Sequence, residues 1–121
     1  MKNLFYIFTL SLILWSCENS DKVTITLENN SDFELTNCKV VSIHGDSIVS
    51  DSIIFGSIQK KNQSTKLWTT KLPNSDGTLY FIGLQNNKEI KRYFCYFSNG
   101  GFIQKTHTIS IQDNEITSSS K

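Results

Sequence analysis

Two patterns of apolar residues divide this chain. The first is a continuous apolar run from Leu4 to Leu14, with Lys2 before it and Glu18 after it. The second begins near residue 23, where apolar and polar residues alternate or form short runs between clusters of Asn, Asp, Gly and Ser. Alternation with period two is typical of strands that bury one face and expose the other. The pattern therefore predicts an N-terminal helical segment followed by a β-domain.

The apolar run is predicted to be an export signal. A membrane-spanning helix needs about 20 apolar residues, and this run is shorter and is followed directly by acidic residues. A basic residue, a short apolar stretch and a polar continuation are the usual parts of a signal peptide. The run is apolar on every side, whereas a helix packed on a small domain would be apolar on one face only. We expect residues 1–16 to be removed.

The end of this segment, Leu14-Trp15-Ser16-Cys17, resembles the lipobox of bacterial lipoproteins. The resemblance implies that Cys17 is acylated and becomes the first residue of the mature chain, and that residues 17–22 form a short polar tether. Trp15 is bulkier than the usual residue at its position. Glu18 stands where Asp would mark inner-membrane retention in enterobacterial lipoproteins, which favours a lipid-anchored protein of the bacterial cell envelope at the outer membrane. An ordinary signal peptide with an incidental Cys is the alternative.

The rest of the chain predicts one all-β domain over residues 23–112, with a disordered tail at 113–121. Strands are expected at 22–28, 35–43, 47–55, 64–71, 78–85, 89–97 and 102–112. About seven short antiparallel strands without a helix indicate a β-sandwich or a small barrel. Asn99-Gly100 is the strongest hairpin signal, because both residues tolerate positive φ. A two-residue loop there would pair Phe97 with Phe102, whereas a three-residue loop would shift the pairing by one residue.

Several segments resemble immunoglobulin-like domains of bacterial surface proteins. They are Leu27–Ser31 followed by Asn37–Val40, Ile58–Ser64, Asp76–Tyr80, and Tyr93-Phe94-Cys95. The resemblance implies an immunoglobulin-like β-sandwich in which Tyr80 would serve as the corner tyrosine that caps a backbone group. It implies no function, because unrelated functions share this fold.

Charge and the scarcity of reactive residues exclude several classes of function. Without residues 1–16 the chain keeps 11 basic and 11 acidic residues and has no basic stripe, so we expect no nucleic-acid partner. The two histidines, His44 and His107, match no metal-ligand spacing and are expected at the surface. Ser57-Ile58-Gln59-Lys60 matches an SxxK motif only formally, since that chemistry needs a helix and a larger domain. We expect no catalysis, cofactor or metal.

Cys38 and Cys95 are the only thiols that remain once Cys17 is lipidated. Both fall within expected strands, in a compartment that permits disulfides. A disulfide between facing sheets is one interpretation. Two unpaired core residues are the other, because free Cys is readily buried.

The strands near 79–84 and 93–97 are apolar on both faces. Either loops cover their second face, or that face presents an aromatic surface of Tyr80, Tyr93, Tyr96 and Trp68 for a protein or glycan partner. Lys91, Arg92 and Lys105 would then form a basic rim.

Three classes of function remain in competition. The preferred one is a non-catalytic binding or structural module of the envelope, attached to the membrane by acyl chains on Cys17. The alternative is a lipid-anchored inhibitor or immunity protein against a cell-wall hydrolase or toxin, acting through a loop at 44–47 or 73–77. An enzyme is the least favoured class, because no nucleophile–base pair is visible.

Overall fold

The computed structural model describes residues 22–45, 48–70, 76–98, 101–102 and 104–121. Within these ranges all regular secondary structure is β-strand, which confirms the expected all-β class. The strands are β1 (Lys22–Asn29), β2 (Leu35–His44), β3 (Ile48–Ile58), β4 (Gln63–Thr69), β5 (Gly77–Gln85), β6 (Lys88–Ser98), β7 (Gly101–Phe102), β8 (Thr106–Ile111) and β9 (Ile116–Ser120).

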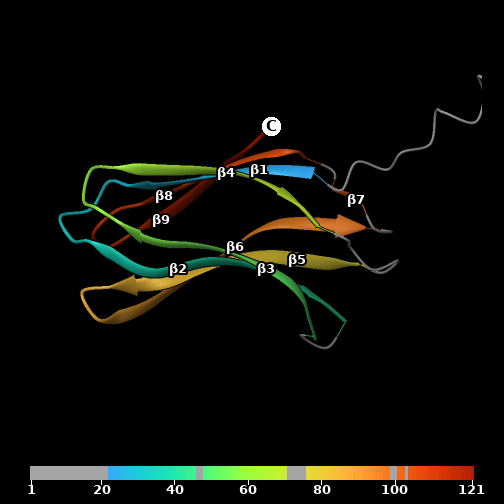
Figure 1. Cartoon of the computed structure of the whole chain (residues 1–121), viewed down its shortest axis with the longest axis horizontal. Coiled ribbons are helices and arrows are strands. Elements are labelled where there is room, and N and C mark those ends of the chain that lie inside the picture. The colour runs from blue at the N-terminus through green and yellow to red at the C-terminus, as the bar shows by residue number, and fades with distance from the viewer. Residues whose placement is uncertain (1–21, 46–47, 71–75, 99–100, 103) are drawn as a thin grey trace, which may run out of the picture.

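The strands form two sheets that lie face to face in a sandwich-like arrangement (Figure 1). One sheet has four strands in the order β4-β1-β8-β9, and the other has five in the order β3-β2-β5-β6-β7. Neighbouring strands are antiparallel except β1 and β8, which run parallel. Side chains from both sheets meet in one core, in which Phe81 and Phe97 are fully buried. The two inner faces therefore share a single hydrophobic layer.

β1 shows how the sequence pattern produces this arrangement. Val23, Ile25 and Leu27 are fully buried, while Thr24 and Thr26 between them remain partly exposed. Alternate side chains of a strand point to opposite faces, so a period-two pattern places every apolar residue in the core. The expected alternation at 22–28 is confirmed.

The expected strand at 102–112 is divided between the two sheets. β7 pairs with the end of β6, and the chain then passes to the other sheet, where β8 pairs with β1. Phe97 lies opposite Phe102, as a two-residue loop requires, although residues 99–100 themselves lie outside the described ranges. The expectation of one continuous strand was wrong because alternation shows which face a residue buries and not which sheet it joins.

The expectation of a disordered tail at 113–121 was also wrong. Residues 116–120 form β9, which pairs with β8 from His107–Ser120 to Ile111–Ile116. This segment has little apolar surface, so backbone hydrogen bonds to β8 and a side-chain contact from Ser120 hold it in place. A strand that is held mainly by backbone hydrogen bonds to its neighbour needs few apolar residues, so the sequence shows almost no hydrophobic pattern there.

The two ends of the sandwich differ. We call the end where β1 begins the entry end; it holds Lys22, the described part of the β2–β3 hairpin and the start of β5. The opposite end, the far end, holds the β1–β2, β3–β4, β5–β6 and β8–β9 turns. The buried Asn29 side chain fixes the far end, since its Nδ2 donates to the carbonyl oxygens of Phe33 (2.8 Å) and Ile58 (3.0 Å).

Candidate binding surface

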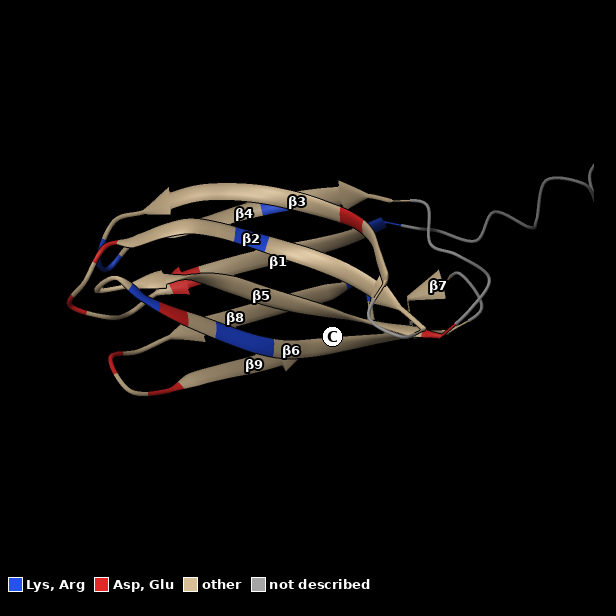
Figure 2. Ribbon diagram, turned by 90° about the horizontal axis from the view of Figure 1, so that it is seen from below, with Lys and Arg blue, Asp and Glu red and all other residues tan. Residues whose placement is uncertain are grey.

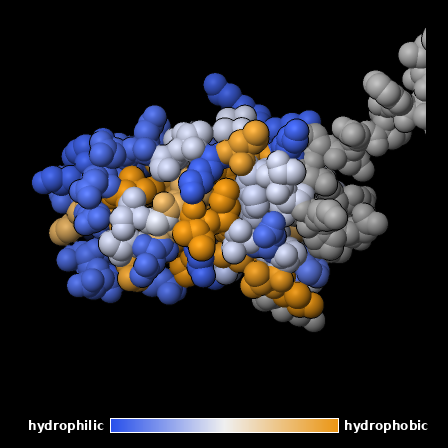
Figure 3. All heavy atoms as spheres, viewed as in Figure 1, coloured by the Kyte–Doolittle hydropathy of each residue, from blue (hydrophilic) through white to orange (hydrophobic). Residues whose placement is uncertain are grey.

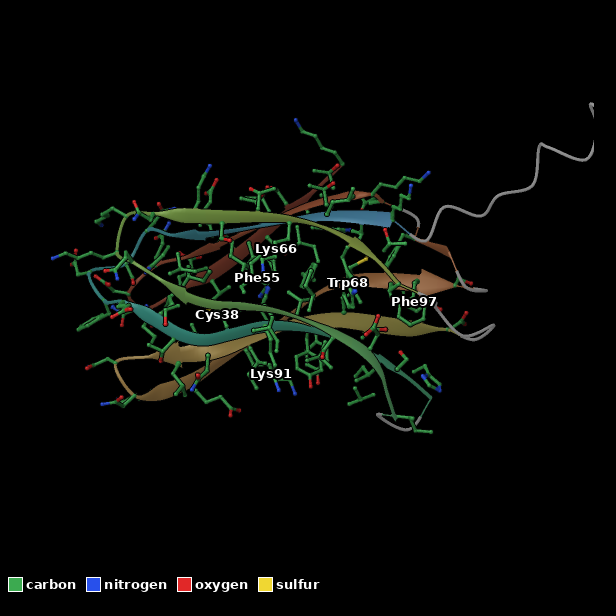
Figure 4. The ribbon with its side chains drawn as sticks, viewed as in Figure 1. Cys38, Phe55, Lys66, Trp68, Lys91 and Phe97 are labelled. Carbon is green, nitrogen blue, oxygen red and sulfur yellow. The ribbon has the colours of Figure 1, made fainter. Side chains whose placement is uncertain are left out.

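The outer face of the five-stranded sheet carries the aromatic residues that the sequence singled out. Tyr80 on β5 lies opposite Tyr93 on β6, with ring centroids 5.4 Å apart and ring planes tilted by 53°. The ammonium group of Lys91 lies 4.2 Å from the Tyr80 centroid and 5.1 Å from the Tyr93 centroid. We call these three residues the tyrosine–lysine cluster. Figure 4 shows Lys91 on the side of its sheet that faces away from the core residue Trp68.

A β-bulge in β6 brings a further tyrosine to this face. Leu79 pairs with Cys95, and the next residue, Tyr80, pairs with Tyr93, so Phe94 is the extra residue. Without the bulge, Tyr93 and Tyr96 would point to opposite faces, because they are an odd number of positions apart. With it, both are about half exposed, at 52% and 51%. A hydrogen bond with Asp76 raises the pKa of Tyr96.

The rest of this outer face mixes apolar residues with charged ones: Lys39 and Lys91 are basic, and Glu89, which pairs with the outward-facing Leu84, is acidic. Ile82 lies between Lys39 on β2 and Lys91 on β6. On the other sheet, the outward positions of β1 and β8 are hydroxyl residues: Thr24, Thr26, Thr106 and Thr108. Among the described residues, the exposed tyrosines Tyr93 and Tyr96 therefore share one face of the sandwich.

The geometry of the cluster defines what it can bind. A cation over a tyrosine ring is held by the ring quadrupole, and interaction with the Tyr93 side chain raises the pKa of Lys91. The ammonium group covers the ring faces on which a sugar would otherwise stack, and it offers a fixed positive charge between two rings. This arrangement suits a ligand that brings a negative group and an apolar surface together.

Two residues expected at this surface lie elsewhere. Trp68 was expected in the aromatic patch, but it is 5% exposed and packs in the core. Its position on β4 pairs with the buried Val23, which places it on the inner face. Lys105 was expected in the rim, but its carbonyl oxygen accepts a hydrogen bond from the Thr24 amide, so it belongs to the other sheet.

Of the three residues expected in the basic rim, Lys91 alone lies on the outer face. Arg92 is exposed but pairs with the buried Phe81 and so lies on the other side of the strand. The corner role implied for Tyr80 by the resemblance does not match its place in the middle of β5, on the outer face beside Tyr93.

Cys38 and Cys95 do not form a disulfide; both are buried as free thiols. They lie on β2 and β6, which flank β5 in the same sheet. Two strand spacings alone place them at least about 9.5 Å apart, beyond the Cα separation of about 6.8 Å that a disulfide spans. The facing-sheet interpretation was therefore wrong. Burial raises the pKa of each thiol to about 11, so both remain protonated at neutral pH.

His107 was expected at the surface and is fully buried instead. Its Nε2 donates to the carbonyl oxygen of Gln104 (3.0 Å), and its Nδ1 accepts from the Ser120 hydroxyl (2.7 Å). The Phe94 ring packs edge-on against the imidazole, with centroids 5.4 Å apart. The histidine therefore joins β8 to β9 and to the bulge of β6, and no catalytic role follows from it.

We expect the buried His107 to make folding sensitive to acid. Desolvation by burial lowers the pKa of His107 below its ordinary value of 6.5, so the unfolded chain binds this proton more readily than the folded one. The contribution to stability is complete above pH 6.5 and is lost as the pH falls from there toward the folded-state pKa. Urea unfolding at roughly pH 7.5 and roughly pH 5.5 should show a larger loss for wild type than for His107→Gln. Equal losses would contradict this assignment.

A cleft at the far end has a lining of mixed polarity. It has a volume of about 630 Å³ and opens between the start of β6 and the β8–β9 turn. Its lining mixes Glu89 and Lys91 with Asp113 and Glu115, above the partly buried Ile90. In the part of the chain that the structure describes, no three His, Cys, Asp or Glu side chains are grouped to hold a metal ion.

The remaining motifs carry no chemistry in the described ranges. Ser57 is exposed near the end of β3 and Lys60 is exposed in the following turn, so neither lies on the helix that an SxxK mechanism requires. Of the loops considered for inhibition, at 44–47 and 73–77, residues 46–47 and 73–75 lie outside the described ranges. Among the described residues, no helix is long and apolar enough to cross a membrane.

Comparison with known proteins supports the fold and adds no function. No family model matches this chain, and no curated protein matches it. It is similar to a protein from Eubacterium rectale solved by NMR, with a TM-score of 0.50 and 14% sequence identity. The match covers 87% of this chain and 93% of that one. At this identity the likeness concerns the fold alone.

Proposed function

We propose that this chain is a non-catalytic, lipid-anchored binding module of the bacterial cell envelope, held at the outer membrane. Its ligand docks on the outer face of the five-stranded sheet. The observation that carries this proposal is the tyrosine–lysine cluster, in which Lys91 lies 4.2 Å from the Tyr80 ring while half of Tyr93 is exposed. Large apolar side chains exposed together on a regular sheet are typical of interaction sites.

The ligand is an envelope protein or glycan that carries acidic groups, and it contacts Lys91 through those groups rather than by stacking a sugar ring on the tyrosines. Tyrosine gives a large contact area, loses little rotamer freedom on binding and orients a partner through its hydroxyl. Lys91 and Lys39 add positive charge on either side of Ile82. Because the cluster is built on paired strands rather than a loop, little ordering is needed when a ligand binds.

The immunoglobulin-like character of the sandwich is part of this proposal. The orders β4-β1 and β3-β2-β5-β6 correspond to E-B and C′-C-F-G of immunoglobulin sandwiches. On this correspondence Cys38 and Cys95 belong to strands C and G of one sheet. An immunoglobulin disulfide joins strands B and F of facing sheets, which accounts for the two free thiols.

A pull-down from envelope extract tests the binding surface. The chain from residue 17 is expected to retain a partner that the variant Tyr80→Ala/Tyr93→Ala loses, with each single change weakening binding by about 1 kcal/mol or more. The matched control is Leu67→Ala, which removes a residue that is 65% exposed on the other sheet. If the double variant retains the same partners as wild type, the cluster is not the binding surface. Capture of a single hydrolase or toxin would favour the inhibitor alternative.

The anchor is tested on the same protein expressed from the full sequence. Mass spectrometry of its N-terminal peptide should find Cys17 as the first residue, carrying acyl chains. A soluble chain that begins elsewhere would contradict the lipid anchor without affecting the pull-down.

A further inference from the structure

We propose that the entry end of the sandwich docks on the lipid bilayer, with Ile48 and Val49 of the β2–β3 hairpin entering the headgroup region. This inference rests on the proposed function, because it takes Cys17 as the point of anchoring. It adds a second contact with the membrane and fixes how the domain is oriented above it.

The length of chain between the anchor and the domain limits the distance to the bilayer. Five residue steps separate Cys17 from Lys22, the first residue of β1. A fully extended chain of this length spans at most about 18 Å. The entry end is therefore held next to the bilayer surface, and the far end is directed away from it.

Exposed aliphatic residues lie at this end. Ile48 is 56% exposed and Val49 is 60% exposed, at the start of β3. They are consecutive residues of a strand, so their side chains point to opposite faces of the hairpin. Both side chains are exposed, one on each face. Figure 3 shows hydrophobic atoms gathered at this hairpin, at the lower right of the molecule. Tyr96 lies near the same end, opposite Thr78, and tyrosine is favoured at membrane interfaces.

Acidic and basic residues are distributed unevenly along the long axis of the domain, in the direction that favours an anionic bilayer at the entry end. Of the eight acidic residues that the structure describes, six lie at the far end: Glu28, Asp32, Glu34, Glu89, Asp113 and Glu115 (Figure 2). Three basic residues, Lys60, Lys61 and Lys88, lie in the turns of the same end, so its described residues keep an excess of negative charge, and Asp76 is the acidic residue beside the start of β5 at the entry end. Lys22, Lys105 and Lys121 lie toward the entry end, where Thr24 bonds to Lys105 and Lys105 bonds to Lys121 through the backbone. Basic residues close to an anionic lipid surface are attracted to it, and acidic residues are repelled.

This orientation is compatible with the proposed binding surface. Tyr80 is three residues beyond Gly77, the first residue of β5, which places the tyrosine–lysine cluster about 10 Å from the entry end. The cluster faces sideways from the sheet. A ligand can therefore reach it while the hairpin remains in contact with lipid.

Depth-dependent quenching of a single added tryptophan tests this inference. The mature chain from Cys17 is coupled through the Cys17 thiol to a maleimide lipid, in vesicles of phosphatidylglycerol and phosphatidylethanolamine with or without brominated acyl chains. Cys38 and Cys95 are buried and protonated, so they do not compete for the maleimide. Val49→Trp places a probe at the entry end. Phe33→Trp is the matched control, because Phe33 is an exposed apolar residue at the far end.

Brominated lipid should reduce the emission of Val49→Trp and leave that of Phe33→Trp unchanged, above the common background from the buried Trp68. Adding Ile48→Asp to the Val49→Trp chain should restore its emission. Equal emission from Val49→Trp with and without bromine, or quenching of Phe33→Trp instead, would overturn the inference. So would a stable dimer of the untethered chain that Ile48→Asp dissociates, because the hairpin would then bind a second copy. Since coupling is chemical, none of these outcomes depends on acylation of Cys17 in cells.

Discussion

Replacing Phe81 with alanine is expected to lower the free energy of unfolding by about 3–5 kcal/mol. Phe81 is among the largest fully buried side chains of the core, and it lies on β5 directly between Tyr80 and Ile82. Deleting its ring removes apolar contacts and leaves a cavity that close-packed neighbours cannot fill. Urea or thermal unfolding of the purified domain measures the loss.

The matched change on the other face is Tyr93→Ala. Tyr93 is 52% exposed, so its removal should change the free energy of unfolding by no more than about 0.5 kcal/mol. The two substitutions separate aromatic residues that form the core from those that are free to bind. A loss of about 3 kcal/mol from Tyr93→Ala would show that the outer face is part of the folded core and would remove the basis of the proposed surface.

The second large effect is expected at Gly77, the first residue of β5. A Cβ atom there would overlap the Ile43 carbonyl oxygen and Cζ of Phe97. The carbonyl belongs to the neighbouring strand, and the Phe97 ring is fully buried, so neither can move away without disturbing the sheet. We expect Gly77→Ala to destabilise the domain by about 3 kcal/mol or more, at the upper end of overpacking effects.

Gly101→Ala is the control for that experiment. At Gly101 the nearest atom to an added Cβ is the Ser98 carbonyl oxygen, at 3.9 Å, an ordinary contact distance. Its effect on stability should remain within about 0.5 kcal/mol. If both variants unfold at the same denaturant concentration as wild type, the close approach at Gly77 is not a constraint on the fold.

Periodicity and turn chemistry predicted the strands well because both are local properties. The expected strands at 22–28 and 78–85 correspond closely to β1 and β5. Asn86 and Asn87, which fall between the expected strands at 78–85 and 89–97, have φ values of 51° and 62°, as a tight hairpin requires. These features depend on a few consecutive residues, and the sequence shows all of them.

The remaining features depend on contacts between distant parts of the chain. The bulge at Phe94 decides that Tyr93 and Tyr96 share a face, yet no local residue type marks it. Trp68 has exposed neighbours on both sides along β4, and only its pairing with Val23 shows that it enters the core. His107 stands between two threonines, and its burial depends on β9, a strand with almost no hydrophobic signal. The sequence predicted the candidate surface in outline. Which residues belong to it could be decided only from the pairing register of the strands.

The parallel pairing of β1 with β8 also determines when the domain can fold. Thr24 lies beside Thr106, so the first strand acquires this neighbour only after nearly the whole chain has been made. Contacts between residues so distant in sequence form slowly, because a long loop must close before any contact compensates for the entropy lost. During synthesis β1 therefore lacks its β8 neighbour, and the four-stranded sheet is incomplete until β8 and β9 have been made. If residues 1–16 are the export signal that the sequence predicts, this late completion keeps the domain incompletely folded, and so competent for export, until its last strands are made.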